Sequence, residues 1–362
     1  MLVYILIAIV MFGILIAVHE FGHFIAAKSL GVKVNEFAIG MGPALLSKQK
    51  GETLYSLRAF PIGGFCAMEG EEEASDDPRS FHNKPAWKKF IILVAGAFMN
   101  FLTGFLIILV LFSQRGGFVA PVITGYMEGA EQLAQAGLQT GDLLYRIDGH
   151  RIYFNEDALT FLSRAGDRVD LELVRDGEHV ILEDFSFPAN IPTQDNGQTV
   201  YKRGIYIGEV VESTPGLVLK NAWYQSIDYA RMVWLSLGDL FTGAVGLKDM
   251  SGAIGIVNII GQAGEQGAEA AVEQNMLPIL GAMLNILSFV AFIAINLAVM
   301  NLLPIPALDG GQILFLVVGG IYHLFTRRRI PQKYLGYVNM AGFFCLIALM
   351  IVVAVNDVIK LF

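Results

Sequence analysis

The sequence predicts a membrane protein that is mainly α-helical, with four transmembrane helices, a membrane-associated β segment and one extracytoplasmic, β-rich α+β domain. Two observations favour this fold class. Of the 362 residues, 54% are hydrophobic and only 16% are charged, whereas a typical soluble domain carries about 25% charged residues. Four long apolar runs are separated by stretches in which charges and strand-like alternation return.

Each of the four apolar runs is long enough to cross a bilayer. They cover residues 2–24, 89–112, 277–303 and 334–356. No basic segment precedes the first run, and it is longer than the apolar core of a signal peptide. We therefore expect the first span to stay uncleaved.

Basic residues predict the orientation of these spans, because lysine and arginine collect on the cytoplasmic side. Nine of them lie between Lys28 and Lys89, and a second group precedes the last span at Arg327, Arg328, Arg329 and Lys333. Both loops should therefore face the cytoplasm, and both termini should face outward. The net charge of −8 offers no basic surface for nucleic acid.

The segments between the spans are predicted to be partly ordered. Residues 53–57 and 60–65 form two short strands around a Pro/Gly turn. The acidic run 69–77 is expected to be a solvated loop. Residues 217–240 carry aromatic and charged side chains together and favour an interfacial amphipathic helix over a span. The two cysteines, Cys66 and Cys345, form neither a disulfide framework nor a zinc pair.

Residues 118–190 have the pattern of a separate domain. The run A-G-L-Q-T-G-D-L-L-Y-R-I-D-G at 136–149 combines a turn, a strand and a tight Asp-Gly turn. Residues 169–177 alternate apolar and polar side chains, and 155–163 can form a short helix. This order resembles a PDZ domain, a module that binds extended peptides at a sheet edge. We expect it either to bind a peptide or C-terminus or to be a spacer.

A candidate metal site lies at the end of the first span, in the sequence H-E-F-G-H. Residues i and i+4 share one helix face, so His19 and His23 can point two imidazoles at one metal ion. Glu20 is then placed to accept a proton from water. Ionisable residues are costly within lipid, so three of them at a span end indicate a functional site.

A second candidate ligand follows the third span, in N-L-L-P-I-P-A-L-D-G-G at 301–311. Two prolines and two glycines should break the helix here. Irregular backbone at membrane depth requires a protein or water environment. Asp309 is thus expected on irregular, accessible backbone, and the topology brings it to the depth of His19 and His23.

With both motifs placed, the chain resembles the site-2 proteases, which are intramembrane zinc metalloproteases, and most of all their bacterial branch with a single PDZ domain. The matching motifs span nearly the whole chain: H-E-F-G-H, P-I-G-G-F, F-H-N-K-P, A-G-x-x-M-N, S-G-x-I-G and N-L-L-P-I-P-A-L-D-G-G. The resemblance implies that His19, His23 and Asp309 bind Zn²⁺ and that Glu20 is the catalytic base. It also implies that Asn301 helps to hold the substrate backbone.

The resemblance further implies a single-span membrane protein as substrate, already trimmed on its outer side, such as an anti-sigma factor or a remnant signal peptide. We expect the strand around Gly63, Gly64 and Phe65 to hold the unwound substrate as an added strand, or else to be a packing element. Alanines replace two family prolines, at Ala97 and Ala253. Oligomeric state is left open.

Four regions are expected. Residues 1–117 hold two spans and the β segment, 118–190 the PDZ domain, 191–275 an amphipathic connection, and 276–362 the last two spans. Two other functions compete with the protease: a metal-dependent membrane transporter, because ionisable groups in spans can form an ion pathway, and a non-catalytic PDZ scaffold. The absence of an inverted repeat argues against a transporter.

Overall fold

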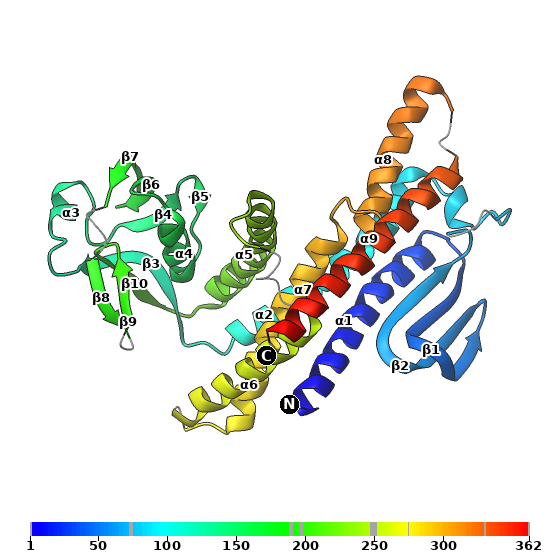
Figure 1. Ribbon diagram of the computed structural model, residues 1–362, viewed down its shortest axis with the longest axis horizontal. Helices are drawn as coiled ribbons and strands as arrows, with labels where there is room; N and C mark the ends of the chain where they lie inside the picture. Colours follow the sequence, from blue (N-terminus) through cyan, green and yellow to red (C-terminus); the bar gives the residue numbers. More distant parts are fainter. Residues whose placement is uncertain are drawn as a thin grey trace. The chain divides into compact units, whose positions relative to one another are not determined.

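The computed structural model describes residues 2–71, 75–187, 191–195, 198–246, 252–273, 275–328 and 331–360. The chain divides into two compact units, one of Leu109–Asp228 and one of Met1–Ile108 with Tyr229–Phe362. The first unit is mainly β-sheet and the second mainly helical, as the ribbon in Figure 1 shows.

Four helices are long and apolar enough to cross a membrane, as the sequence predicted. They are α1 (Leu2–Ser29), α2 (Ala86–Phe112), α7 (Pro278–Asn301) and α9 (Gln332–Ile359). Each contains an apolar stretch of at least 18 residues with almost no charge. A helix is the stable conformation for such a stretch in lipid, because it pairs every backbone N–H and C=O group within the segment. The first helix extends to Ser29, five residues beyond the expected end of the first span.

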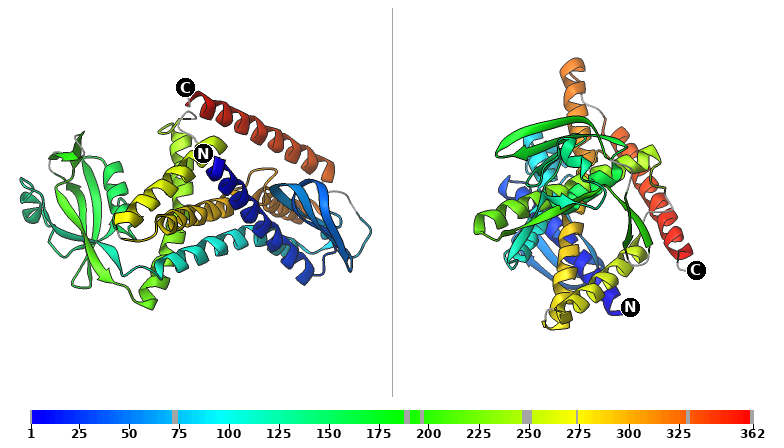
Figure 2. Two further views of the ribbon diagram at one scale, coloured as in Figure 1. Left: turned by 90° about the horizontal axis from the view of Figure 1, so that it is seen from below. Right: turned by 90° about the vertical axis from the view of Figure 1, so that its left-hand side faces the viewer.

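Two further helices belong to the same unit, α6 (Ala253–Glu273) and α8 (Asp309–Thr326), and α5 (Pro215–Thr242) is divided between the two units at Asp228. The sequence predicts only an amphipathic connection over residues 191–275, within which α6 is a long helix. Its glycines allow close packing, since Gly267 of α6 and Gly281 of α7 abut through their backbones. Figure 2 shows α6 and α7 side by side. Ser251 of the S-G-x-I-G motif lies outside the described residues.

A bent β-hairpin packs along α1. It consists of β1 (Val34–Lys50), which the sequence did not indicate, and β2 (Thr53–Met68), which contains both expected short strands. The first half of β1 lies between two parts of β2, because Phe37 pairs with both Tyr55 and Cys66. The backbone of β2 approaches α1 closely at Gly13, where a Cβ would come within 2.5 Å of a carbonyl oxygen of β2.

The Leu109–Asp228 unit is built around one sheet with the strand order β10-β3-β4-β6-β7. Its strands are β3 (Gly117–Tyr126), β4 (Leu143–Ile147), β5 (His150–Arg151), β6 (Arg168–Arg175), β7 (Glu178–Ser186) and β10 (Ile205–Glu212). Helices α3 (Gln132–Gln135) and α4 (Asn155–Arg164) and the pair β8 (Ile191–Asp195) and β9 (Gln198–Lys202) complete it. Because β10 pairs with β3, the domain extends past residue 190, the end that the sequence suggested.

Leucine and isoleucine side chains from β4 and β6 form the core of this unit, with Leu144, Ile147 and Leu173 fully buried. One ion pair supports it. The Arg175 guanidinium donates to both carboxylate oxygens of the fully buried Asp142, over 2.7 and 2.8 Å. In this bidentate geometry both oxygens of the buried carboxylate accept a hydrogen bond from the cation that neutralises it.

Candidate metal centre

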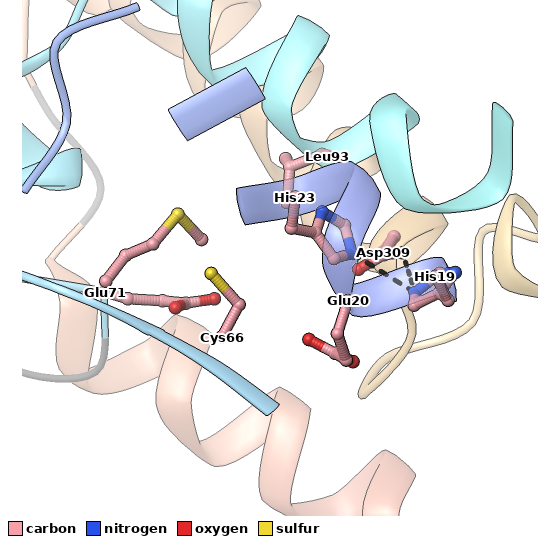
Figure 3. Close-up of a pocket in the computed structure, with 8 residues that line it drawn as sticks. His19, Glu20, His23, Cys66, Glu71, Leu93 and Asp309 are labelled. Atoms are coloured by element: carbon pink, nitrogen blue, oxygen red, sulfur yellow. Dashed lines mark hydrogen bonds and ion pairs between the residues drawn. The ribbon is translucent and has the colours of Figure 1, made fainter. Parts of the chain in front are cut away.

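Three potential ligand atoms converge where α1 meets the start of α8. His19 and His23 lie one turn apart on α1, and their Nε2 atoms are 3.1 Å from each other. The Oδ2 atom of Asp309 lies 3.2 Å from Nε2 of His19 and 3.4 Å from Nε2 of His23. Figure 3 shows the three side chains facing one another. The structure thus joins residues that are 286 or more positions apart in the chain (309 minus 23).

The ligand atoms fit a tetrahedral zinc ion. Bonds of about 2.0–2.1 Å with tetrahedral angles place two ligand atoms about 3.3 Å apart, and the observed separations are 3.1–3.4 Å. The buried Oδ2 of Asp309 has no hydrogen-bond partner. A buried acceptor without a donor is costly, and a cation between the three atoms removes that cost. Three protein ligands leave one zinc position open, which is the arrangement of catalytic sites.

Hydrogen bonds to the other ring nitrogens orient both imidazoles. His23 donates from Nδ1 to the carbonyl oxygen of Ile92 in α2, over 2.8 Å. The side-chain amide of Asn301 lies 3.4 Å from Nδ1 of His19. A neutral imidazole that offers Nε2 to a metal carries its hydrogen on Nδ1, so the amide meets it best with its oxygen. Asn301 therefore touches His19, a candidate metal ligand, and its expected role in substrate binding does not include this contact.

Helix α2 approaches the metal centre through a glycine. A Cβ on Gly96 would lie 2.5 Å from Nε2 of His23, 2.6 Å from Cε1 of His19 and 2.8 Å from Nε2 of His19. One turn of α1 away from His19, Gly22 is equally tight against the carbonyl oxygen of Ala95. The two glycines bring the α2 backbone onto the ligand pair, so any side chain at Gly96 would occupy space that the ligands use.

Asp309 is the first residue of α8, and not part of an irregular segment as the sequence suggested. The preceding loop is held by a bond from the Ala307 backbone N–H to the Asn339 side chain of α9. The glycines that follow Asp309 have no room for a side chain, since a Cβ on Gly310 or Gly311 would meet backbone atoms within 2.4 Å. The helix start is thereby fixed, and its first side chain points at the imidazoles.

The ligands line a cavity of about 120 Å³ together with Glu20, Cys66, Met68, Glu71 and Leu93. Glu20 thus lies in the expected pocket, beside the ligands (Figure 3). Burial raises the pKa of the Cys66 thiol, with a further contribution from the charge of Glu20, so the thiol stays protonated.

Glu71 was not expected in the pocket. The sequence predicts a solvated loop for the acidic run 69–77, but in the structure Glu69 and Glu71 have different surroundings. Glu69 bonds to Ser75, Asn35 and Lys33, which hold its pKa down at about 2. Glu71 lines the pocket, and burial raises its pKa to about 7. No local sequence signal distinguishes the two glutamates, because the difference comes from how the loop packs on the helices.

The model of peptidase family M50 matches residues 7–349. This chain belongs to peptidase family M50. A Clostridium perfringens protein named as a candidate zinc metalloprotease is 35% identical over 358 residues, with 98% of each chain covered. The zinc metalloprotease RasP of Shouchella clausii is 28% identical, with 93% of this chain and 94% of that protein covered. The regulator of sigma-W protease RasP of Bacillus subtilis is 26% identical, with 98% of each chain covered.

The M50 peptidase is therefore a zinc metalloprotease of the site-2 type, as its motifs predicted. Its remaining expected site residues lie in β2. A Cβ on Gly64 would be 3.7 Å from Cγ of Glu20, so this strand passes directly beside the acidic residue. Gly63 has a positive φ of 89°, and Phe65 packs under the guanidinium of Arg58 at 4.8 Å. Ala97 is buried in α2 next to Gly96, and Ala253 begins α6.

Proposed function

We propose that this peptidase cleaves a peptide bond within the transmembrane segment of single-span membrane proteins. His19, His23 and Asp309 hold the zinc ion, and Glu20 is the general base. One observation carries the proposal: three ligand atoms from two distant helices converge within 3.4 Å, in the same cavity as a carboxylate. A structural zinc site would instead be closed by a fourth protein ligand.

The residues divide the chemistry between them. Bound zinc would supply a Lewis acid that polarises the scissile carbonyl and lowers the pKa of water. Glu20, next to His19 on α1, accepts a proton from the attacking water and returns it to the departing amine. Ile92 and Asn301 keep the imidazoles in the required tautomer and orientation. Gly96 keeps the space at their Nε2 atoms free.

The substrate helix must unwind before cleavage, because its carbonyls are hydrogen-bonded and shielded. The last part of β2 offers a place for the unwound strand. Within the described residues, the stretch from Gly64 to Met68 pairs on one side only, with Val34–Ile39 of β1. An unpaired strand edge adds a further strand readily. Gly64, beside Glu20, would bring the added strand to the base.

The substrate class follows from the relatives and the topology that we propose. The Bacillus subtilis relative is named a regulator of sigma-W protease, so anti-sigma factors and remnant signal peptides, trimmed beforehand on the outer side, are the proposed substrates. Both termini and the Leu109–Asp228 unit would then be extracytoplasmic, with the active site towards the cytoplasm. We assign that unit to a PDZ fold that binds a peptide or C-terminus, or excludes untrimmed substrates by size.

The decisive experiment compares wild-type protein with Glu20→Gln, each purified in detergent and given a tagged single-span substrate. We expect the variant to keep about one zinc ion per chain and to lose the cleaved product. Asp76→Asn, which removes an exposed carboxylate of the acidic run, should cleave as the wild type does. Equal cleavage by Glu20→Gln would refute the assignment of the base. Zinc binding without cleavage by either protein, over a panel of substrates, would favour the transporter or scaffold.

A further inference from the structure

The pocket contains a carboxylate that the proposed chemistry does not use. Glu71 follows β2 and turns back over the strand, since its backbone N–H donates to the carbonyl oxygen of Met68 at 3.4 Å. Its side chain then reaches into the cavity beside Cys66 (Figure 3). Glu20, Cys66 and Glu71 all line this one cavity, and the charges of both glutamates raise the pKa of the Cys66 thiol.

The proposed chemistry already assigns a role to each of the other two carboxylates in the pocket. Asp309 faces the two imidazoles, and Glu20 is the proposed base. Among the described residues no ion pair involves Glu71, and the hydrogen-bond partner of its carboxylate is the backbone N–H of Met68. The neighbouring Glu69, by contrast, is bonded to Lys33, Asn35 and Ser75. The two glutamates lie two positions apart, and only Glu71 lines the pocket, where no basic side chain is paired with it.

Peptide hydrolysis produces a group that suits such a carboxylate. The C–N bond breaks, the oxygen of one water molecule joins the carbonyl carbon, and both water protons end on the nitrogen. The products are a carboxylate and an ammonium ion. The new carboxylate has the metal centre as its partner. An ammonium ion in a small, partly apolar cavity needs an anion, because an unpaired buried charge is strongly disfavoured.

We propose that Glu71 binds the new amino terminus of the C-terminal cleavage product and holds the amine on the side of the pocket away from the metal ligands. This inference rests on the proposed function, because it needs an amine formed at this site. Burial raises the pKa of Glu71 to about 7, so its anionic form is stabilised when a cation enters the pocket. Met68 and Leu93, which line the same cavity, would contact the apolar residue that carries the amine.

The test measures binding and not cleavage. The probe is a short apolar peptide amide with a fluorescent label at its C-terminal end, prepared with a free amino terminus and with an acetylated one. Binding to the full-length chain in detergent is followed by fluorescence polarisation at about pH 7.5, where a free α-amino group is largely protonated. We expect the wild type to bind the free amine about 10- to 100-fold more tightly than the acetylated peptide.

In Glu71→Gln the ratio of the affinities for the free-amine and acetylated peptides should fall to nearly one. Glu71→Asp should retain part of this preference, and Asp76→Asn should retain all of it. The preference should persist after zinc is removed with a chelator, because the carboxylate and not the metal supplies it. An undiminished preference in Glu71→Gln, or none in the wild type, would overturn the proposal. Zinc content and unfolding temperature equal to wild type exclude misfolding of the variant.

The same assay separates this inference from the proposed function. Glu20→Gln should keep the preference for the free amine although it cannot cleave. If Glu20→Gln cleaves normally while Glu71→Gln loses the preference, the assignment of the base fails and the amine site stands. If Glu20→Gln is inactive and Glu71→Gln keeps the preference, the amine site fails and the base stands.

Discussion

The substitution Gly96→Ala tests how closely α2 is fitted to the metal centre. The added methyl group would lie 2.5 Å from Nε2 of His23 and 2.8 Å from Nε2 of His19. Ordinary contact begins at 3.4 Å, so Nε2 of His23 would have to move by about 0.9 Å (3.4 minus 2.5) and Nε2 of His19 by about 0.6 Å (3.4 minus 2.8). Movement of α2 away from α1 would relieve the overlap only by separating the closely packed backbones of Gly22 and Ala95.

These displacements are large for a zinc site, in which ligand distances vary by only about 0.2 Å. Changes to groups that merely orient a ligand cost about 10- to 100-fold in metal affinity. Gly96→Ala moves two ligands at once, so we expect zinc affinity to fall by at least about 100-fold and cleavage of a single-span substrate to be lost.

The assay is competition for zinc against a chromophoric chelator in detergent, with unfolding temperature measured in parallel. Gly319→Ala is the matched control, because this glycine also lies in a helix, α8, and has nothing within 4 Å of its added methyl group. The control should bind zinc normally. Wild-type zinc affinity in Gly96→Ala would show that α2 does not confine the ligands, and would refute the reasoning.

Three further predictions concern stability. Arg175→Met leaves the buried Asp142 carboxylate without its cation, so we expect a loss of about 3–5 kcal/mol in the unfolding free energy of the sheet unit, measured in urea, with the exposed Arg168→Met as control. The pKa of Glu69 is lowered from 4.5 to about 2, so Glu69 stabilises the loop fully above about pH 4.5, and this stabilisation is lost as the pH falls towards 2. Amide hydrogen exchange in the loop should therefore accelerate between these two pH values. Glu69→Gln should abolish this pH dependence. Asp357 accepts from the backbone N–H groups of Gly252 and Gly255 at the start of α6, so Asp357→Ala should increase proteolytic cleavage near residue 252, which unchanged protection would contradict.

Local sequence predicted those parts of the site that depend on one helix. The spacing of His19 and His23 is enough to put two imidazoles on one face, because the helical period is fixed by backbone geometry. The four candidate spans could likewise be predicted, since a long apolar run in lipid has few alternatives to a helix. The motif around Asp309 indicated a ligand but gave its local structure wrongly, because backbone contacts of Gly310 and Gly311 start a helix there.

Other features escaped prediction because their pattern is not periodic. Strand β1 contains Gly40, Gly42 and Pro43 and has no regular alternation, and only its pairing with two parts of β2 makes it a strand. Helix α6 is rich in glycine, which lowers helix propensity, and its packing against α7 compensates.

By itself, then, the sequence determined the class of protein and predicted the candidate metal ligands and the candidate base, because those features depend on composition and short spacings. Only the tertiary structure decided that Asn301 touches His19, that Gly96 borders the ligands, and that Glu71 and not Glu69 lines the pocket. Each of these facts joins segments that are far apart in the chain or separates near-identical neighbours. Such contacts depend on which surfaces pack together in the tertiary structure, and short-range residue preferences do not specify that packing.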